Sequence, residues 1–146
     1  MTQVFYEIKE PYSAQQMFDL VNDIDAYPQF VPDCVGAGIT DKQDNLVRAY
    51  LEVAKLGFRK QFTTINRLNA PDTIEMALIE GPFKKLTGKW SFISLSENEC
   101  MIRFSLDFEF KSKIMDITFT PIFKEVMQNM VKAFSTRAKK VYGYKG

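Results

Sequence analysis

The stretch from Cys34 to Phe110 alternates between apolar and polar residues with a period of two, and turn-forming residues divide it into segments. This pattern predicts antiparallel strands that each present one apolar face. The alternation is clearest at the end of the stretch, where one face would carry Cys100, Ile102, Phe104, Leu106, Phe108 and Phe110. Another element must cover a sheet with one dry face, so this feature constrains the fold more than any other.

The predicted strands begin near the N-terminus. Residues 3–10 form one candidate, which Pro11 ends because proline cannot donate to a strand ladder. The weakest candidate covers residues 34–41. The others are expected at 46–54, 58–68, 73–79, 84–95 and 100–110. The sequence therefore predicts six or seven antiparallel strands.

Two short helices are expected between the first strand and the rest of the sheet. Ser13 is a good N-cap residue, Gln16 completes a capping box, and the helix would run to about Val21. Residues 25–32 contain two prolines, so they allow only one short helical turn, which Asp25 would cap.

A long amphipathic helix is expected at the C-terminal end. Apolar residues recur at intervals of three and four from about Thr120 to Tyr142. Thr120 is expected as the N-cap, Pro121 as the first helical residue and Gly143 as the end. Residues 112–119 fit two alternatives: they extend the helix backward, with a kink at Pro121, or they form a segment at the sheet edge.

This long helix is the only predicted element large enough to cover the sheet. A chain of 146 residues is long enough for one substantial core. We therefore expect a single α+β domain over residues 1–146, in which a curved sheet wraps around the C-terminal helix. A curved sheet and a straight helix do not touch along their full length, so we also expect an apolar cavity between them.

The chain contains no histidine, which excludes several kinds of active site. A Ser-His-Asp triad, a Cys-His pair and the usual His-containing zinc sites are impossible. Cys34 and Cys100 lack the spacing of a redox or zinc motif and are expected to be buried thiols. Pairs of acids that could transfer protons are expected on exposed faces: Asp19 with Asp23, and Asp107 with Glu109. We predict that the protein is not an enzyme and holds no metal or cofactor.

Charge is unevenly distributed along the chain. Residues 1–45 hold eight acidic and two basic residues, a net charge of −6, and the remainder carries +7. Cations gather near the C-terminus at Lys132, Arg137, Lys139, Lys140 and Lys145. They suit either the C-terminal half of a solvated helix or an anionic partner. The absence of a signal peptide or long apolar run predicts a cytoplasmic protein.

Three motifs resemble one known family. They are Asp25-Ala-Tyr-Pro-Gln-Phe-Val-Pro-Asp-Cys34, Gly81-Pro-Phe-Lys-Lys-Leu-Thr-Gly-Lys-Trp-Ser-Phe92 and Met130-Val-Lys-Ala-Phe-Ser-Thr-Arg-Ala-Lys-Lys-Val-Tyr-Gly143. They are similar to the START-like family that bacterial ribosome association toxins share with mitochondrial coenzyme Q-binding proteins, and most similar to the bacterial branch. The resemblance spans nearly the whole chain.

The resemblance implies a helix-grip fold with a hydrophobic tunnel for ubiquinone or a related prenylquinone. Eukaryotic members of the family support respiration, whereas the bacterial branch binds the large ribosomal subunit and blocks subunit joining. The tunnel would be lined by inward-facing residues: Val53, Phe62, Met76, Trp90, Phe92, Phe104, Phe108, Phe123, Met127, Met130 and Phe134. The alternative is that these side chains form an ordinary packed core.

Lys60 and Asn66 are polar residues that stand at inward positions of the strand at 58–68. A buried ammonium needs a partner, so Lys60 would either donate to a ligand oxygen such as a quinone carbonyl or lie at the sheet edge near the strand start.

Basic residues are the candidates for contact with ribosomal RNA. One group follows the Gly81-Pro82 turn, and the other lies on the C-terminal helix: Lys84, Lys85 and Lys89, then Lys132, Arg137, Lys139 and Lys140. The alternative partner for these cations is an anionic membrane surface, which the protein would contact peripherally, for example at the inner membrane.

Overall fold

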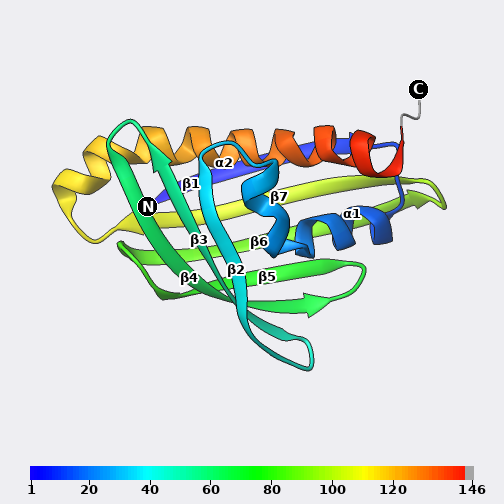
Figure 1. Ribbon diagram of the computed structural model, residues 1–146, viewed down its shortest axis with the longest axis horizontal. Coiled ribbons are helices and arrows are strands. Elements are labelled where there is room, and N and C mark those ends of the chain that lie inside the picture. The colour runs from blue at the N-terminus through cyan, green and yellow to red at the C-terminus, as the bar shows by residue number, and fades with distance from the viewer. Residues whose placement is uncertain (144–146) are drawn as a thin grey trace.

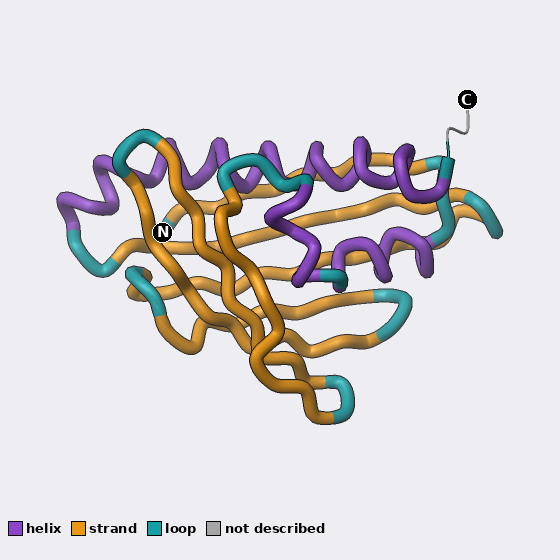
Figure 2. Tube along the Cα trace, in the orientation of Figure 1, coloured by secondary structure: helices purple, strands orange, loops and turns teal. Residues whose placement is uncertain are grey.

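The computed structural model describes residues 1–143 (Figures 1 and 2). Its strands are β1 (Thr2–Glu10), β2 (Cys34–Gln43), β3 (Leu46–Lys55), β4 (Phe58–Asn69), β5 (Thr73–Glu80), β6 (Phe83–Ser96) and β7 (Glu99–Phe110). Its helices are α1 (Ala14–Asn22), the 3-10 helix η1 (Ile24–Gln29) and α2 (Lys113–Tyr142). The predicted order of elements is confirmed, including the weak strand β2. Lys145 lies outside the described residues.

All strands belong to one antiparallel sheet with the order β1-β7-β6-β5-β4-β3-β2. The first strand joins the last one, because β1 pairs with β7 from Thr2↔Phe108 to Glu10↔Cys100. Figure 1 shows α2 running along one side of the curved sheet, with α1 and η1 beside it. The expected α+β helix-grip arrangement is confirmed.

The capping box of α1 is present as predicted. The backbone N–H of Gln16 donates to Ser13 Oγ at 3.1 Å, and the N–H of Ser13 donates to Gln16 Oε1 at 2.9 Å. Next to this capping box, the Tyr12 hydroxyl donates to the carbonyl of Gly143 at 2.8 Å and the Tyr142 hydroxyl donates to the carbonyl of Gln16 at 2.7 Å. These bonds fasten the end of α2 to α1.

The cap expected for η1 is wrong. The helix begins at Ile24, one residue before Asp25, and its N-cap position, Asp23, makes no side-chain cap hydrogen bond. Asp25 Oδ1 instead accepts a 3.0 Å hydrogen bond from the backbone N–H of Ile39. Asp25 therefore ties η1 to the edge strand β2, a partner distant in the sequence.

The start expected for α2 is also wrong. The helix begins at Lys113, and Ser112 is its N-cap, with Oγ accepting from the N–H of Met115 at 3.2 Å. Asp116 Oδ1 accepts from the Phe110 N–H at 3.1 Å and from the Thr120 hydroxyl at 3.2 Å. These contacts stabilise the additional turns, and the helix continues through Pro121. Of the two alternatives for residues 112–119, the backward extension is the observed one.

Phe123 anchors α2 to the sheet. Its side chain is fully buried, and its ring lies 4.9–6.2 Å from the rings of Phe58, Phe62, Phe83, Phe108 and Phe110. Aromatic pairs at these separations add to the stability gained from burying apolar area. This phenylalanine cluster packs between the sheet and α2.

Candidate functional site

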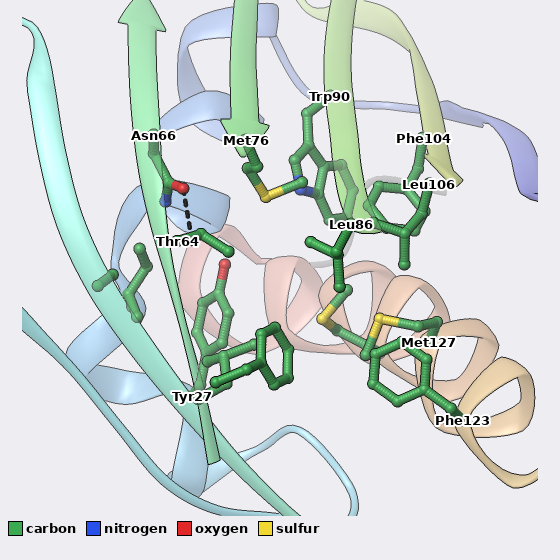
Figure 3. Close-up of a pocket in the computed structure, with 15 residues that line it drawn as sticks. Tyr27, Thr64, Asn66, Met76, Leu86, Trp90, Phe104, Leu106, Phe123 and Met127 are labelled. Carbon is green, nitrogen blue, oxygen red and sulfur yellow. Dashed lines mark hydrogen bonds between the residues drawn. The ribbon is translucent and has the colours of Figure 1, made fainter. Parts of the chain in front are cut away.

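An apolar cavity adjoins this cluster, between the sheet, η1 and α2 (Figure 3). Its lining residues come from seven elements: Ile24 and Tyr27 of η1; Ala49 and Leu51 of β3; Phe62, Thr64 and Asn66 of β4; Met76 of β5; Leu86 and Trp90 of β6; Phe104 and Leu106 of β7; and Phe123, Met127 and Met130 of α2. The expected cavity between sheet and helix is therefore present.

The cavity has a volume of about 60 Å³. A water needs roughly 10–15 Å³ on this measure, so the space holds a few waters, while sites for drug-sized ligands are typically about 300–1,000 Å³. Three methionines, Met76, Met127 and Met130, lie on its wall. Methionine is unbranched and changes rotamer readily, so a larger ligand would enter by displacing these side chains.

Two polar side chains on β4 face this cavity. The Thr64 hydroxyl donates a 2.7 Å hydrogen bond to Asn66 Oδ1, and the two residues are only 8% and 4% exposed. Figure 3 shows this bond beside Met76 and Trp90. The amide nitrogen of Asn66 forms no hydrogen bond with the described residues, so it is a buried donor with capacity left for an acceptor.

Trp90 contributes a second donor to the wall. Its ring packs against Phe104 at 4.4 Å and Phe134 at 5.4 Å, and its indole nitrogen has no hydrogen-bond partner among residues 1–143. No lining residue is charged. Since an ion would lose its hydration here without a counter-charge, the cavity suits a neutral ligand that carries oxygen acceptors.

Tyr27 has a structural role on the same wall. Its hydroxyl donates to the backbone carbonyl of Val21, and burial raises the pKa of the phenol well above its usual value. Its ring lies 5.3 Å from that of Phe134. The phenol therefore stays protonated and holds η1 against α1.

The structure brings most of the predicted tunnel residues together. Those that line the cavity are Phe62, Met76, Trp90, Phe104, Phe123, Met127 and Met130. Four others are buried but lie in the surrounding core: Val53, Phe92, Phe108 and Phe134. Several lining residues were missed: Ile24, Tyr27, Ala49, Leu51, Thr64, Leu86 and Leu106. The strand residues among them share the inward alternation of their predicted neighbours, and that signal could have identified them.

Of the two alternatives for Lys60, the solvent-exposed position near the start of β4 is the observed one. The side chain is exposed and does not line the cavity, although its neighbours Phe58 and Phe62 on the same strand face are buried. The pairing of β4 with β5 ends at Thr63↔Glu80, whereas pairing with β3 continues past Lys60. Lys60 therefore lies on a part of β4 that projects beyond β5, where its ammonium reaches solvent.

The basic residues expected to bind RNA fall on two different faces. Lys85 and Lys89 alternate with the buried residues Leu86 and Trp90, which places them on the outer face of the sheet. Lys132, Lys139 and Lys140 are exposed on α2, which covers the inner face. Arg137 lies over the ring of Phe30, with its guanidinium carbon 4.9 Å from the ring centroid. The structure does not join the two groups into one patch.

The two thiols outside the cavity show no sign of activation. Both cysteines are buried as predicted; burial raises the pKa of the Cys34 thiol, and burial, with Glu10 and Glu99 nearby, raises that of Cys100 to about 11. Neither is a reactive thiolate near neutral pH. Glu109 pairs with the N-terminal amine at 3.5 Å and with Lys84 at 3.7 Å.

Comparison with known proteins places this geometry in a family. The chain is 47% identical over 97% of its length to the Escherichia coli K12 protein named ribosome association toxin RatA, covering 90% of that protein. It has the same identity and coverage with the persistence and stress-resistance toxin PasT of E. coli O6:H1 strain CFT073. It is 29% identical over 90% of its length to the mitochondrial coenzyme Q-binding protein COQ10 homolog B of Xenopus laevis, covering 56% of that protein.

Solved structures agree with the fold. The aromatase/cyclase Zhui of Streptomyces sp. R1128 superposes with a TM-score of 0.85 over 95% of this chain and 94% of that one, at 14% sequence identity. Residues 11–135 match the family described as polyketide cyclase / dehydrase and lipid transport. With that match and the relatives at 47% identity, the chain belongs to this polyketide cyclase / dehydrase and lipid transport family.

Proposed function

We propose that this protein is a ribosome association factor without enzymatic activity, and that its apolar cavity binds a neutral hydrophobic ligand of the prenylquinone class. The first part rests on the relatives named for ribosome association, which are 47% identical over 97% of the chain. The second part rests on the uncharged cavity with free N–H donors at Asn66 and Trp90.

The ribosome role predicts binding to the large subunit through exposed cations. Lys132 and Lys140 are two turns apart on α2, so they point to a similar side of the helix. Phosphate contacts release counterions, so affinity should fall steeply as salt rises. The test is sedimentation of the protein with purified large subunits over a salt series, followed by a subunit-joining assay.

Two matched pairs of substitutions reverse the charge of lysines on opposite faces of the fold. Lys132→Glu with Lys140→Glu should weaken subunit binding and reduce the salt slope, whereas Lys85→Glu with Lys89→Glu changes the outer sheet face by the same charge. If the sheet variant alone loses binding, the contact face is the sheet. If neither pair affects binding and the salt response is flat, the cationic interface is wrong.

The ligand role is favoured by the chemistry of the cavity wall. A quinone carries two carbonyl acceptors on a neutral ring and an apolar tail, whose burial gains about 0.8 kcal/mol per CH₂ before ordering costs. COQ10 homolog B, a more distant relative, is named a coenzyme Q-binding protein. Extraction of the purified protein with organic solvent and mass spectrometry should recover a stoichiometric prenylquinone. An empty extract, with no rise in melting temperature on adding quinone, would remove this role.

The residues that line the cavity also support the proposal that the protein has no enzymatic activity. The titratable group that lines the cavity is Tyr27, whose hydroxyl is already bonded to Val21 and whose pKa is raised by burial. A general acid or base works best with a pKa near the operating pH, and this phenol is far above it. Incubation with quinones should therefore return them unchanged.

A further inference from the structure

One end of the molecule exposes large apolar side chains that the fold does not use. Leu56 is 76% exposed in the β3–β4 turn, and Ile114 and Ile117 are 78% and 72% exposed in the first turns of α2. The rings of Phe58 and Phe119, 5.2 Å apart, join these two segments. Figure 1 shows both at the left end of the molecule. We call Leu56, Ile114 and Ile117 the apolar tip.

The backbone at Leu56 adds to this observation. Leu56 and Gly57 have φ angles of 49° and 83° and form the two-residue turn between β3 and β4. Hairpin turns with positive φ at both central positions favour Asn before Gly, because a branched apolar residue is strained there. Leucine serves neither the turn nor the core at this position. An exposed leucine that breaks the local preference is therefore best explained by an external contact.

Cations surround the apolar tip. Lys60, Lys111 and Lys113 are exposed and make no ion pair with the described residues, and Lys84 makes only the 3.7 Å pair with Glu109. A 2.9 Å hydrogen bond from the Lys111 N–H to the Pro82 carbonyl brings the β5–β6 turn to the start of α2. We call Lys60, Lys84, Lys111 and Lys113 the basic collar.

Acidic groups near the apolar tip pair with some of the cations there: Glu109 with Lys84 at 3.7 Å, and Asp33 and Glu125 with Lys55, which precedes Leu56, at 3.5 and 3.0 Å. Asp116 points back into the fold, where it accepts the hydrogen bonds from Phe110 and Thr120. Glu80 is exposed at the end of β5 and lies on the β5–β6 side of the collar. Lys60, Lys111 and Lys113 remain without an ion pair among residues 1–143, so they supply the positive charge beside the apolar tip.

We propose that the apolar tip and the basic collar dock this protein onto the surface of a bilayer that contains anionic phospholipids. Leu56, Ile114 and Ile117 would enter the boundary between headgroups and acyl chains, while the lysines contact phosphates. A second copy of the chain is disfavoured as the occupant, because two positively charged collars would repel each other. This inference concerns a surface that the proposed function does not use.

The phenylalanine cluster lies beneath the apolar tip, on the side toward the cavity. Phe58 contacts Phe119 beneath the tip, and Phe58 also lies 6.2 Å from Phe123, a cavity-lining residue. Phe62, on the cavity wall too, lies 5.4 Å from Phe83 at the start of β6. The cluster thus separates the tip from the cavity. A docked protein would present this aromatic barrier to the bilayer.

The experiment is flotation of the ligand-free full chain with vesicles of phosphatidylcholine, with and without phosphatidylglycerol. The tip variant combines Leu56→Asn, Ile114→Gln and Ile117→Gln; all three sites are exposed and Leu56→Asn restores the favoured turn residue, so it should fold. The collar variant combines Lys60→Gln, Lys111→Gln and Lys113→Gln. The matched control is Leu95→Asn with Val141→Gln, which removes exposed apolar side chains (48% and 50% exposed) elsewhere.

Wild type and control should bind phosphatidylglycerol vesicles, and the tip variant should bind at least about tenfold more weakly. The collar variant should lose the preference for anionic vesicles, and added salt should reproduce that loss. Equal binding by wild type and tip variant, or no binding by wild type, overturns the proposal. The same variants are tested for binding to large ribosomal subunits. If the tip substitutions weaken ribosome binding but not vesicle binding, the apolar tip belongs to the ribosome contact and the bilayer proposal is overturned. Because the flotation experiment uses protein without quinone, a failure of the bilayer proposal does not affect the test of quinone binding.

Discussion

The Thr64 hydroxyl donates to Asn66 Oδ1 at 2.7 Å inside an otherwise apolar cavity. Buried polar groups on a core-facing strand cost stability unless they are paired, and here the pair still leaves the Asn66 amide nitrogen available. The arrangement gives β4 a donor that can recognise a polar atom, in addition to the indole N–H of Trp90 on β6. It also makes a double-mutant cycle informative.

Asn66→Leu should lower the free energy of unfolding by about 1–3 kcal/mol, because it leaves the Thr64 hydroxyl without its acceptor. Adding Thr64→Val should recover most of that loss, since both polar groups are then gone. Urea unfolding of the wild type, both single variants and the double variant measures the coupling. Additive effects would contradict a direct hydrogen bond. The double variant should also bind quinone more weakly than wild type, although it is stable.

Trp90 is the chain's single tryptophan and lines the cavity, so it reports on occupancy. A quinone bound against the indole should quench its fluorescence with a saturable dependence on concentration. Ala49→Phe places a ring into the cavity and should abolish that saturation, while the exposed substitution Phe5→Ala serves as a control at 57% exposure. Circular dichroism checks that Ala49→Phe folds; if it does not, Ala49→Leu takes its place. Saturable quenching that persists in the filled variant would put the quinone elsewhere.

Ser112 caps α2 and therefore stabilises the part of the helix that carries Ile114 and Ile117. Ser112→Ala should lower the free energy of unfolding by about 1 kcal/mol, because the Met115 N–H loses its acceptor. Ser112→Asp should retain the stability, since aspartate caps well and suits the helix N-terminus. Thermal unfolding of both variants measures the difference. Equal stability of the alanine and aspartate variants would show that the first turn does not depend on this cap.

Glu10 predicts a pH dependence of stability. Burial raises the pKa of its carboxyl above the ordinary 4.5, against the opposing effects of the Ser135 hydrogen bond and the Lys139 charge. A raised folded-state pKa means that the native state binds the proton more tightly than the unfolded state. This contribution is fully present below the unfolded pKa and is lost as the pH rises through the folded pKa.

Glu10→Gln keeps an acceptor for Ser135 and removes the charge. Relative to wild type, it should therefore be more stable at neutral pH, and the difference should shrink at acidic pH. Urea unfolding at several pH values compares the two proteins, with Glu97→Gln as an exposed control. A difference that grows toward acidic pH would reverse the assigned direction of the pKa shift.

Local patterns in the chain were enough for most of the fold. The alternation of apolar residues and the capping residues Ser13 and Gln16 depend on neighbours within a few positions, so the strands and α1 could be predicted. The start of α2 could not be placed, because Asp116 is held by Phe110 across the loop and this contact outweighs the signal at Pro121. Asp25 was misread for the same reason, since its partner Ile39 belongs to another element.

The sequence by itself determined which face of each strand is apolar, that no histidine chemistry is available and which family the chain resembles. Only the tertiary structure decided which of those apolar residues surround empty space and which fill the core. Phe92 and Trp90 share a strand face, yet only Trp90 lines the cavity. Lys60 has inward alternation but reaches solvent, because β5 ends before it. Alternation is a property of one strand, whereas a cavity and an exposed tip depend on where strands end and on how a straight helix meets a curved sheet.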